Sequence, residues 1–152
     1  MTENLATSEV QAKGRVRIVK TNADGVVTYE HEVPNLVVTT GKSFIASKLR
    51  ATTNSPASMT HMGIGTSSTS PAAGDTALGT QTGRVSLSGD TATTNYVTFT
   101  ATFPAGTGDG AIVEAGIFNA SSGGTMLCRT TFPVVTKGSG DTLAITWVVT
   151  VS

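Results

Sequence analysis

The chain has little of what marks a catalytic, membrane or nucleic-acid-binding protein. Charged residues make up only 13% of its 152 residues and the formal net charge is zero. This balance argues against general electrostatic binding to nucleic acid or to membrane surfaces. No apolar run approaches the ~20 residues that a membrane-spanning helix needs. The N-terminus has no basic region followed by an apolar run, so we expect no secretory signal, and synthesis in a reducing cytoplasm.

Cysteine is also scarce. Cys128 is the only one, so no disulfide can form within the chain. It lies in the apolar run Met126-Leu127-Cys128-Arg129, where a reduced cysteine acts as a small hydrophobe. We expect Cys128 to pack in the core, with a reactive or intermolecular thiol as the alternative.

Candidate metal ligands and catalytic groups are few and scattered. His31 and His61 are the only histidines, whereas a metal site needs three or four convergent ligands and a hydrolytic triad would need distant residues that no motif connects. Asp109 and Asp141 lie in glycine-containing loops, but one carboxylate per loop indicates a turn rather than a calcium site. We therefore expect a non-enzymatic protein without catalytic residues, cofactors or metals.

One short motif calls for a nucleotide-binding alternative. Gly41-Lys42-Ser43 matches the end of a phosphate-binding loop, but the glycine required five residues earlier is replaced by Leu36. We interpret Gly41 instead as a residue that starts or breaks structure before a helix.

Threonine and glycine, in contrast, are abundant: 28 and 17 residues. Threonine is β-branched and suits a pleated, half-solvated surface. The C-terminal residues 142–151 alternate strictly, as a half-buried β-strand does. Their predicted core face consists of Leu143, Ile145, Trp147, Val149 and Val151.

The same periodicity predicts an all-β protein with one short helix. Asn22-Ala23-Asp24-Gly25 predicts a hairpin between the first two strands, and clusters such as Ser88-Gly89-Asp90 predict turns between later ones. About eight strands with evenly placed turns are typical of an antiparallel β-sandwich or jelly-roll-like fold. The helix is predicted within residues 39–50, across one end of the sheets. The predicted strands cover residues 15–20, 26–33, 59–65, 77–87, 93–103, 112–119, 125–135 and 142–151.

We divide the chain into an N-terminal arm, residues 1–13, and a β-sandwich domain, residues 14–152. The arm is polar and has no period, so it cannot bury enough surface to order itself. It is either a free tail or an arm that orders on a neighbouring subunit. In the second case its interface residues are Thr2, Glu3, Asn4, Leu5, Val10 and Lys13.

Two charged residues interrupt apolar strands that follow one another in the chain. Glu114 lies in the run 112–118 and Arg129 in the run 126–132. If these strands form a hairpin, the two side chains can make a cross-strand pair, with Arg84 as a possible third member. The alternative is that both lie at solvated sheet edges.

Several segments, taken in order, carry a family resemblance. They are Pro34-Asn35-Leu36-Val37-Val38-Thr39-Thr40-Gly41-Lys42, residues 62–66 through 73–78, and Val113-Glu114-Ala115-Gly116-Ile117-Phe118-Asn119. The pattern NLVVTTGK … MGIGT … DTAL … EAGIFN … TFP resembles small β-sandwich domains of bacteriophage tail-fibre, tail-associated and capsid-decoration proteins. It covers about residues 14–152.

The resemblance implies a virion structural protein that assembles as a homo-oligomer, commonly a trimer, with the major capsid protein or other virion proteins as partners. It implies no catalytic residue. The chain shows no repetitive shaft or heptad region, so we expect a capsid decoration (cement) protein first. A tail-fibre, collar or adaptor component is the next alternative. A host-receptor or glycan-binding module is disfavoured, since the predicted loops lack aromatic residues that would stack on sugars.

Overall fold

The computed structural model describes residues 10–50 and 54–152. Over these ranges the chain forms nine strands and one short helix, which confirms the all-β class, although the strands number nine rather than about eight. The elements are β1 (Ala12–Thr21), β2 (Val27–Val37), α1 (Thr39–Lys48), β3 (His61–Gly65), β4 (Gln81–Ser86), β5 (Gly89–Thr93), β6 (Tyr96–Phe103), β7 (Gly110–Phe118), β8 (Met126–Lys137) and β9 (Thr142–Val151).

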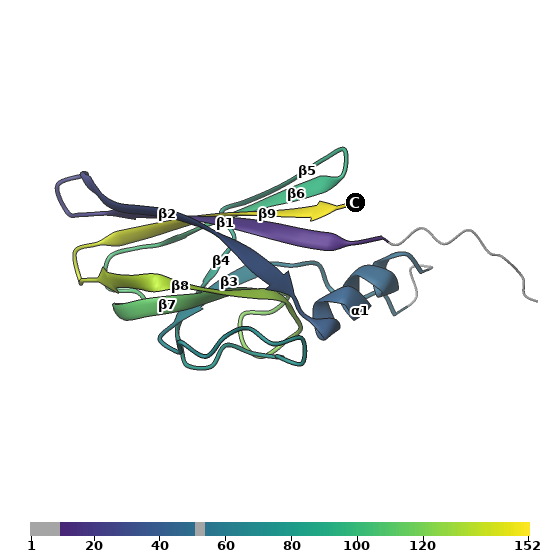
Figure 1. Cartoon of the computed structure of the whole chain (residues 1–152). Helices are drawn as coiled ribbons and strands as arrows, with labels where there is room; N and C mark the ends of the chain where they lie inside the picture. Colours follow the sequence, from purple (N-terminus) through teal and green to yellow (C-terminus); the bar gives the residue numbers. More distant parts are fainter. Residues whose placement is uncertain (1–9, 51–53) are drawn as a thin grey trace, which may run out of the picture.

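The strands form one continuous antiparallel sheet that curls into two layers (Figure 1). The strand order is β4-β3-β7-β8-β2-β1-β9-β6-β5. Strand β2 belongs to both layers, because it pairs with β1 as far as Asn35 and then with β8 through Leu36 and Val37. The lower layer is β4, β3, β7 and β8, and the upper layer is β1, β9, β6 and β5.

The chain crosses between the layers a second time after β4. The Leu87 amide donates to the Thr60 carbonyl at 2.8 Å, and the Ser88 amide donates to the Thr100 carbonyl of β6, also at 2.8 Å. The connection from β4 to β5 therefore joins the two edge strands of the sheet, on the side opposite β2.

The main core lies between the two layers. The predicted alternation of β9 is confirmed from Leu143 to Val149: Leu143, Ile145, Trp147 and Val149 are buried, and Ala144, Thr146 and Val148 between them are partly exposed. Val151, predicted on the same core face, is instead exposed, because it lies at the open end of the sandwich. Cys128 is fully buried in the same cluster, as expected for a core cysteine.

One predicted strand, residues 93–103, is in fact the end of one strand and the whole of another. β5 ends at Thr93 and β6 begins at Tyr96, so Thr94 and Asn95 form a two-residue hairpin turn. Thr94 takes a φ of +50° there, a conformation that a β-branched residue rarely adopts. Because this turn contains no glycine, the alternation of side chains continues through it, and the sequence gives no sign that one strand ends and another begins. The predicted turn at Ser88-Gly89-Asp90 was placed too far along, because Gly89 and Asp90 already belong to β5.

The helix α1 lies across one end of the sandwich, as predicted (Figure 1). Gly41 lies inside its first turn rather than before it, and it is the buried residue of the helix. A Cβ at this position would lie 1.9 Å from the Leu127 carbonyl oxygen, so only glycine lets the helix backbone contact β8. No helix in the described ranges has the length and apolar character needed to cross a membrane.

Candidate docking surface

A long connection, residues 66–80, covers the outer face of the lower layer. Beneath it lies a small apolar cluster of Val38, Leu78, Phe118 and Met126, separate from the main core. Strand β7 is consequently buried on both faces from Ile112 to Phe118. Any charged side chain on the outer face of β7 therefore needs partners supplied by the protein.

The predicted pair of Glu114 and Arg129 is confirmed. In the β7–β8 hairpin, Glu114 lies opposite Thr131 and Arg129 lies opposite Gly116, so the two side chains meet diagonally across the strands. The Arg129 guanidinium donates to Glu114 Oε2 through Nε at 3.0 Å and through Nη2 at 2.8 Å. Both side chains are buried, which excludes the alternative of solvated sheet edges.

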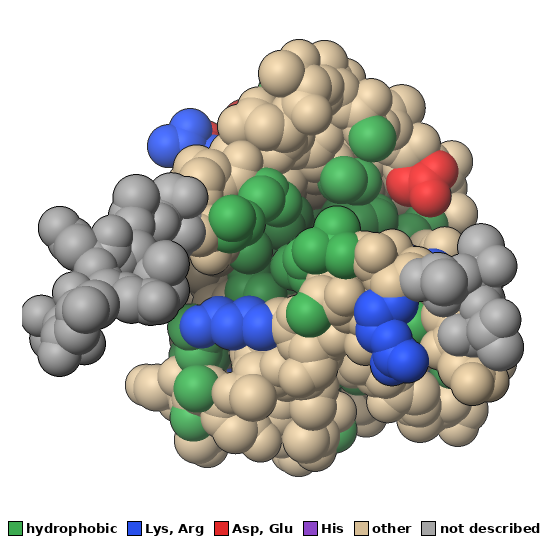
Figure 2. All heavy atoms as spheres, turned by 90° about the vertical axis from the view of Figure 1, so that its right-hand side faces the viewer, with side chains coloured by type: hydrophobic (Ala, Val, Ile, Leu, Met, Phe, Trp, Pro, Cys, Tyr) green, Lys and Arg blue, Asp and Glu red, His purple; other side chains and the backbone are tan. Residues whose placement is uncertain are grey.

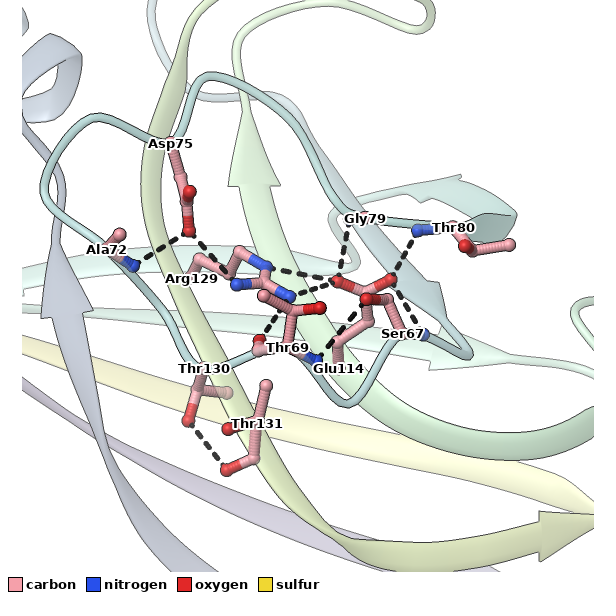
Figure 3. Close-up of polar contacts among 10 residues, drawn as sticks. All are labelled: Ser67, Thr69, Ala72, Asp75, Gly79, Thr80, Glu114, Arg129, Thr130 and Thr131. Atoms are coloured by element: carbon pink, nitrogen blue, oxygen red, sulfur yellow. Dashed lines mark hydrogen bonds and ion pairs between the residues drawn. The ribbon is translucent and has the colours of Figure 1, made fainter.

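The covering connection completes the shell of Glu114. The amides of Ser67 and Thr80 donate to Oε1 at 3.2 and 2.8 Å, and the Gly79 amide donates to Oε2 at 2.9 Å (Figure 3). Burial by itself raises the pKa of Glu114, but these amides and Arg129 outweigh it, so the pKa lies below its ordinary value. The carboxylate is therefore ionised and engaged on both oxygens, which suits a structural anchor and not a general acid.

The third charged member is Asp75 and not Arg84. Asp75 Oδ2 accepts hydrogen bonds from Arg129 Nη1 at 3.0 Å and from the Ala72 amide at 2.9 Å, while Arg129 Nη2 also donates to the Thr69 carbonyl at 2.9 Å. The ion pair thus fastens the 66–80 connection onto the sheet at three places along its length (Figure 3).

Arg84 has a separate role, so its assignment to the pair was wrong. Its guanidinium lies 3.6 Å from the centre of the Phe118 ring. It donates to the carbonyls of Ala120 and Gly123 at 3.1 and 2.9 Å, and to Gln81 Oε1 at 2.8 Å. Arg84 therefore holds the turn between β7 and β8, on a different part of the lower layer from Asp75.

The other polar candidates are dispersed. Asp141 Oδ2 accepts the Gly138 amide at 2.8 Å, which confirms its role in a turn, and Asp109 pairs with the buried ammonium of Lys137 at 2.6 Å. His61 contacts the hydroxyls of Thr60 and Ser86. Across residues 10–50 and 54–152, no three histidine, cysteine or acidic side chains come together as a metal site would require. Burial also raises the pKa of the Cys128 thiol, so at neutral pH it is protonated and inert.

The feature that does suggest binding is a pair of adjoining hollows at the α1 end, which we call the α1-end groove. One hollow, of about 610 Å³, lies between α1 and the ends of β5, β6 and β9; Met59, Phe99 and Leu127 of the main core reach its wall. The other, of about 650 Å³, lies between α1 and the start of β1. Ile45 and Val151 line both, so the two hollows lie side by side.

Large exposed apolar side chains gather at this groove. Val10 is 76% exposed, Leu49 86%, Tyr96 39% and Val151 37%, and all four line it. Figure 2 looks onto this end and shows hydrophobic side chains around a hollow, with basic side chains along its lower rim and an acidic group above. Apolar surface collected in one place, unlike single exposed residues, marks an interaction site.

The helix that forms one wall of the groove packs Phe44 and Ile45 against the main core but does not bury its apolar face completely. Gly41 is buried, but Phe44 and Ile45 are only partly covered and Leu49 projects outward. A ten-residue helix that contains threonine, glycine and serine has little stability of its own. Its incompletely buried apolar face is consistent with a partner that completes the packing.

The rim of the groove is mainly basic. Lys13, Lys42 and Lys48 line it, against a single carboxylate, Asp90, among its lining residues. Lys48 also lies 5.5 Å from the centre of the Phe44 ring and within 3.4 Å of the Ser58 hydroxyl. An apolar groove with this rim favours a partner segment that carries both apolar and acidic side chains.

The predicted interface residues divide between the described and the remaining parts of the chain. Val10 and Lys13 line the groove, and Lys13 already belongs to β1, paired with Thr150. Thr2, Glu3, Asn4 and Leu5 lie outside the described residues. Sequence reasoning missed Leu49 and Val151, because each continues an ordinary helix or strand pattern and nothing local signals that it is uncovered.

Comparison of the chain with protein-family models, with curated proteins and with solved structures found no match. The virion resemblance therefore rests on the sequence pattern alone.

Proposed function

We propose that this protein is a non-enzymatic structural subunit that works through protein–protein contact. More specifically, we propose that it decorates a bacteriophage head as a cement protein, in a homo-oligomer and most simply a homotrimer, with the major capsid protein as partner. The observation that carries the contact role is the α1-end groove, where four large apolar side chains are exposed together. The assignment to a phage head rests on the sequence resemblance.

The energetics support a role in contact. Covering a leucine-sized side chain fully stabilises a complex by about 1.5–3 kcal/mol, and several such side chains share the groove. A ligand that binds only the assembled shell lowers the free energy of that shell by mass action. The sandwich would act as a rigid body, since its buried ion pair fastens the longest described connection onto the sheet.

Immunogold labelling of particles of the encoding phage tests the location. We expect label over the head. Label confined to the tail would contradict decoration and favour the fibre, collar or adaptor alternative. Unlabelled particles would overturn a virion role altogether.

A second experiment tests the groove. Heads that lack the protein are mixed with the purified chain and heated, and release of DNA is followed by a fluorescent dye. We expect the native chain to raise the release temperature and Leu49→Ser to raise it less. Val26→Ser is the matched control, because Val26 is exposed but lies in the β1–β2 turn away from the groove. Equal protection by both variants would exclude the groove as the docking surface.

A further inference from the structure

We propose that the α1-end groove receives the N-terminal segment, residues 1–9, of a second copy of this chain. This inference rests on the proposed role of the groove as a docking surface, and it names the occupant. It is carried by three observations: where the described chain begins, the composition of the segment, and the chemistry of the groove.

The described chain begins at the groove itself. The Gln11 amide donates to the Ser152 carbonyl at 2.7 Å and the Ser152 amide donates back to the Gln11 carbonyl at 2.8 Å, so the ladder between β1 and β9 continues to Gln11. Val10, the residue before Gln11, lies at the rim of the groove and lines one hollow. Nine residues can extend about 30 Å from this point, which is long enough to reach a neighbouring molecule.

The segment and the groove complement one another. Residues 1–9 contain Glu3, Glu9 and the apolar Leu5, and no lysine or arginine. The groove presents apolar side chains with Lys13, Lys42 and Lys48 around them, and Asp90 as its one lining carboxylate. A segment with one apolar anchor and two flanking carboxylates fits such a surface, with electrostatics contributing mainly to specificity and encounter rate.

A second copy is a better source of the segment than the same chain. The β1–β9 ladder keeps the chain extended up to Gln11, so the residues before Val10 would have to turn back to enter the groove of their own chain. Residues 6–9 are Ala, Thr, Ser and Glu. They contain no glycine, proline, asparagine or aspartate, and Ser8 is the one residue among them that favours a turn.

The geometry also has a consequence for assembly. The segment and the groove are different surfaces, so each copy would give its segment to one neighbour and receive another. Such a head-to-tail contact closes into a ring when the rotation between copies permits. A closed ring of three copies would be a homotrimer of the kind proposed above.

Disulfide trapping in full-length chains tests the exchange. Leu5→Cys and Leu49→Cys chains, with tags of different mass, are co-expressed and oxidised, and linked peptides are identified by mass spectrometry. We expect a disulfide between the two chains in several-fold higher yield than in a matched pair of Leu5→Cys with Val26→Cys, at the opposite end of the sandwich. The native Cys128 is buried and should not compete.

The other outcomes overturn the proposal. If a single chain that carries both substitutions forms its disulfide as a monomer, the segment occupies its own groove. If neither pairing exceeds the Val26→Cys control, the segment is not the occupant. Should trapping fail while Leu49→Ser still weakens head protection, the groove binds another virion protein: the inference falls and the proposed function stands. If the disulfide forms between chains but immunogold labels no phage particle, the inference stands and the proposed virion function falls.

Discussion

Beneath residues 66–80 the sandwich buries charged side chains and supplies every one with partners, whereas at the α1 end it exposes apolar side chains and leaves them uncovered. Glu114 receives three backbone amides and two guanidinium donors. Leu49 and Val10, in contrast, are more than three-quarters exposed. An ionised residue such as Glu114 is often taken as a sign of function, but here the paired charges are structural and the uncovered apolar surface is the better candidate for binding.

The comparison predicts opposite responses to substitution. Changes in the buried network should lower stability and leave the docking surface intact, while changes at the groove should weaken docking and leave stability nearly unaltered.

Arg129→Ala should lower the free energy of unfolding by about 3–5 kcal/mol, because it leaves Glu114 buried without its cationic partner. Urea denaturation of Arg129→Ala, Glu114→Ala and the double variant measures this. The double variant should lose much less than the sum of the two single losses, whereas small and additive losses would contradict the pairing. Arg17→Ala is the control: it removes an exposed ion pair with Glu30 and should cost at most about 1 kcal/mol.

Acid should weaken the same region. The folded-state pKa of Glu114 is lowered, so the unfolded chain binds more protons as pH falls below the ordinary carboxyl value of about 4.3. The stability due to Glu114 is therefore present above that pH and is lost as pH falls toward the folded-state pKa. Melting temperatures measured from pH 7 to pH 3 should show a flatter acid limb for Glu114→Gln than for the native chain. Parallel curves would contradict this.

Gly41→Ala tests the contact that holds the wall of the groove. Alanine normally favours a helix over glycine by up to about 1 kcal/mol. Here its Cβ would lie 1.9 Å from the Leu127 carbonyl oxygen, so we expect a net loss of about 1–3 kcal/mol from overpacking and a displaced α1. Gly74→Ala is the matched control, because a Cβ there meets nothing within 4 Å. Equal melting temperatures for Gly41→Ala and Gly74→Ala would show that α1 can shift to make room for the added Cβ without loss of stability.

Leu49→Ser should have the smallest effect on folding, within about 0.5 kcal/mol, because the side chain is exposed. Its measurable effect should appear instead in head protection. A large drop in melting temperature would show that Leu49 supports the fold. It would contradict the expectation that substitutions at the groove affect docking and not stability.

Much of the architecture was predictable because strands are local in pattern. The bounds of β9 matched the prediction, since its alternation is unbroken and glycine-containing turns precede it. The pairing of Glu114 with Arg129 was predicted only as one of two alternatives, because charges that interrupt successive apolar strands can either pair across a hairpin or lie at solvated sheet edges. The start of β4 was not: residues 77–87 appeared to be one strand, but the amides of Gly79 and Thr80 turn toward Glu114 instead of joining the ladder.

The sequence alone determined that alternating, threonine-rich segments pair into an antiparallel all-β protein with one short helix, because side-chain periodicity and turn chemistry act over a few residues. Only the tertiary structure decided that Asp75 meets Arg129 across 54 positions, and that Leu49, Tyr96 and Val151 come together uncovered at one end. The physical reason is that burial depends on which segments the fold places over a side chain. The periodicity of a short sequence segment does not determine whether α1 covers the end of the sandwich or leaves it exposed.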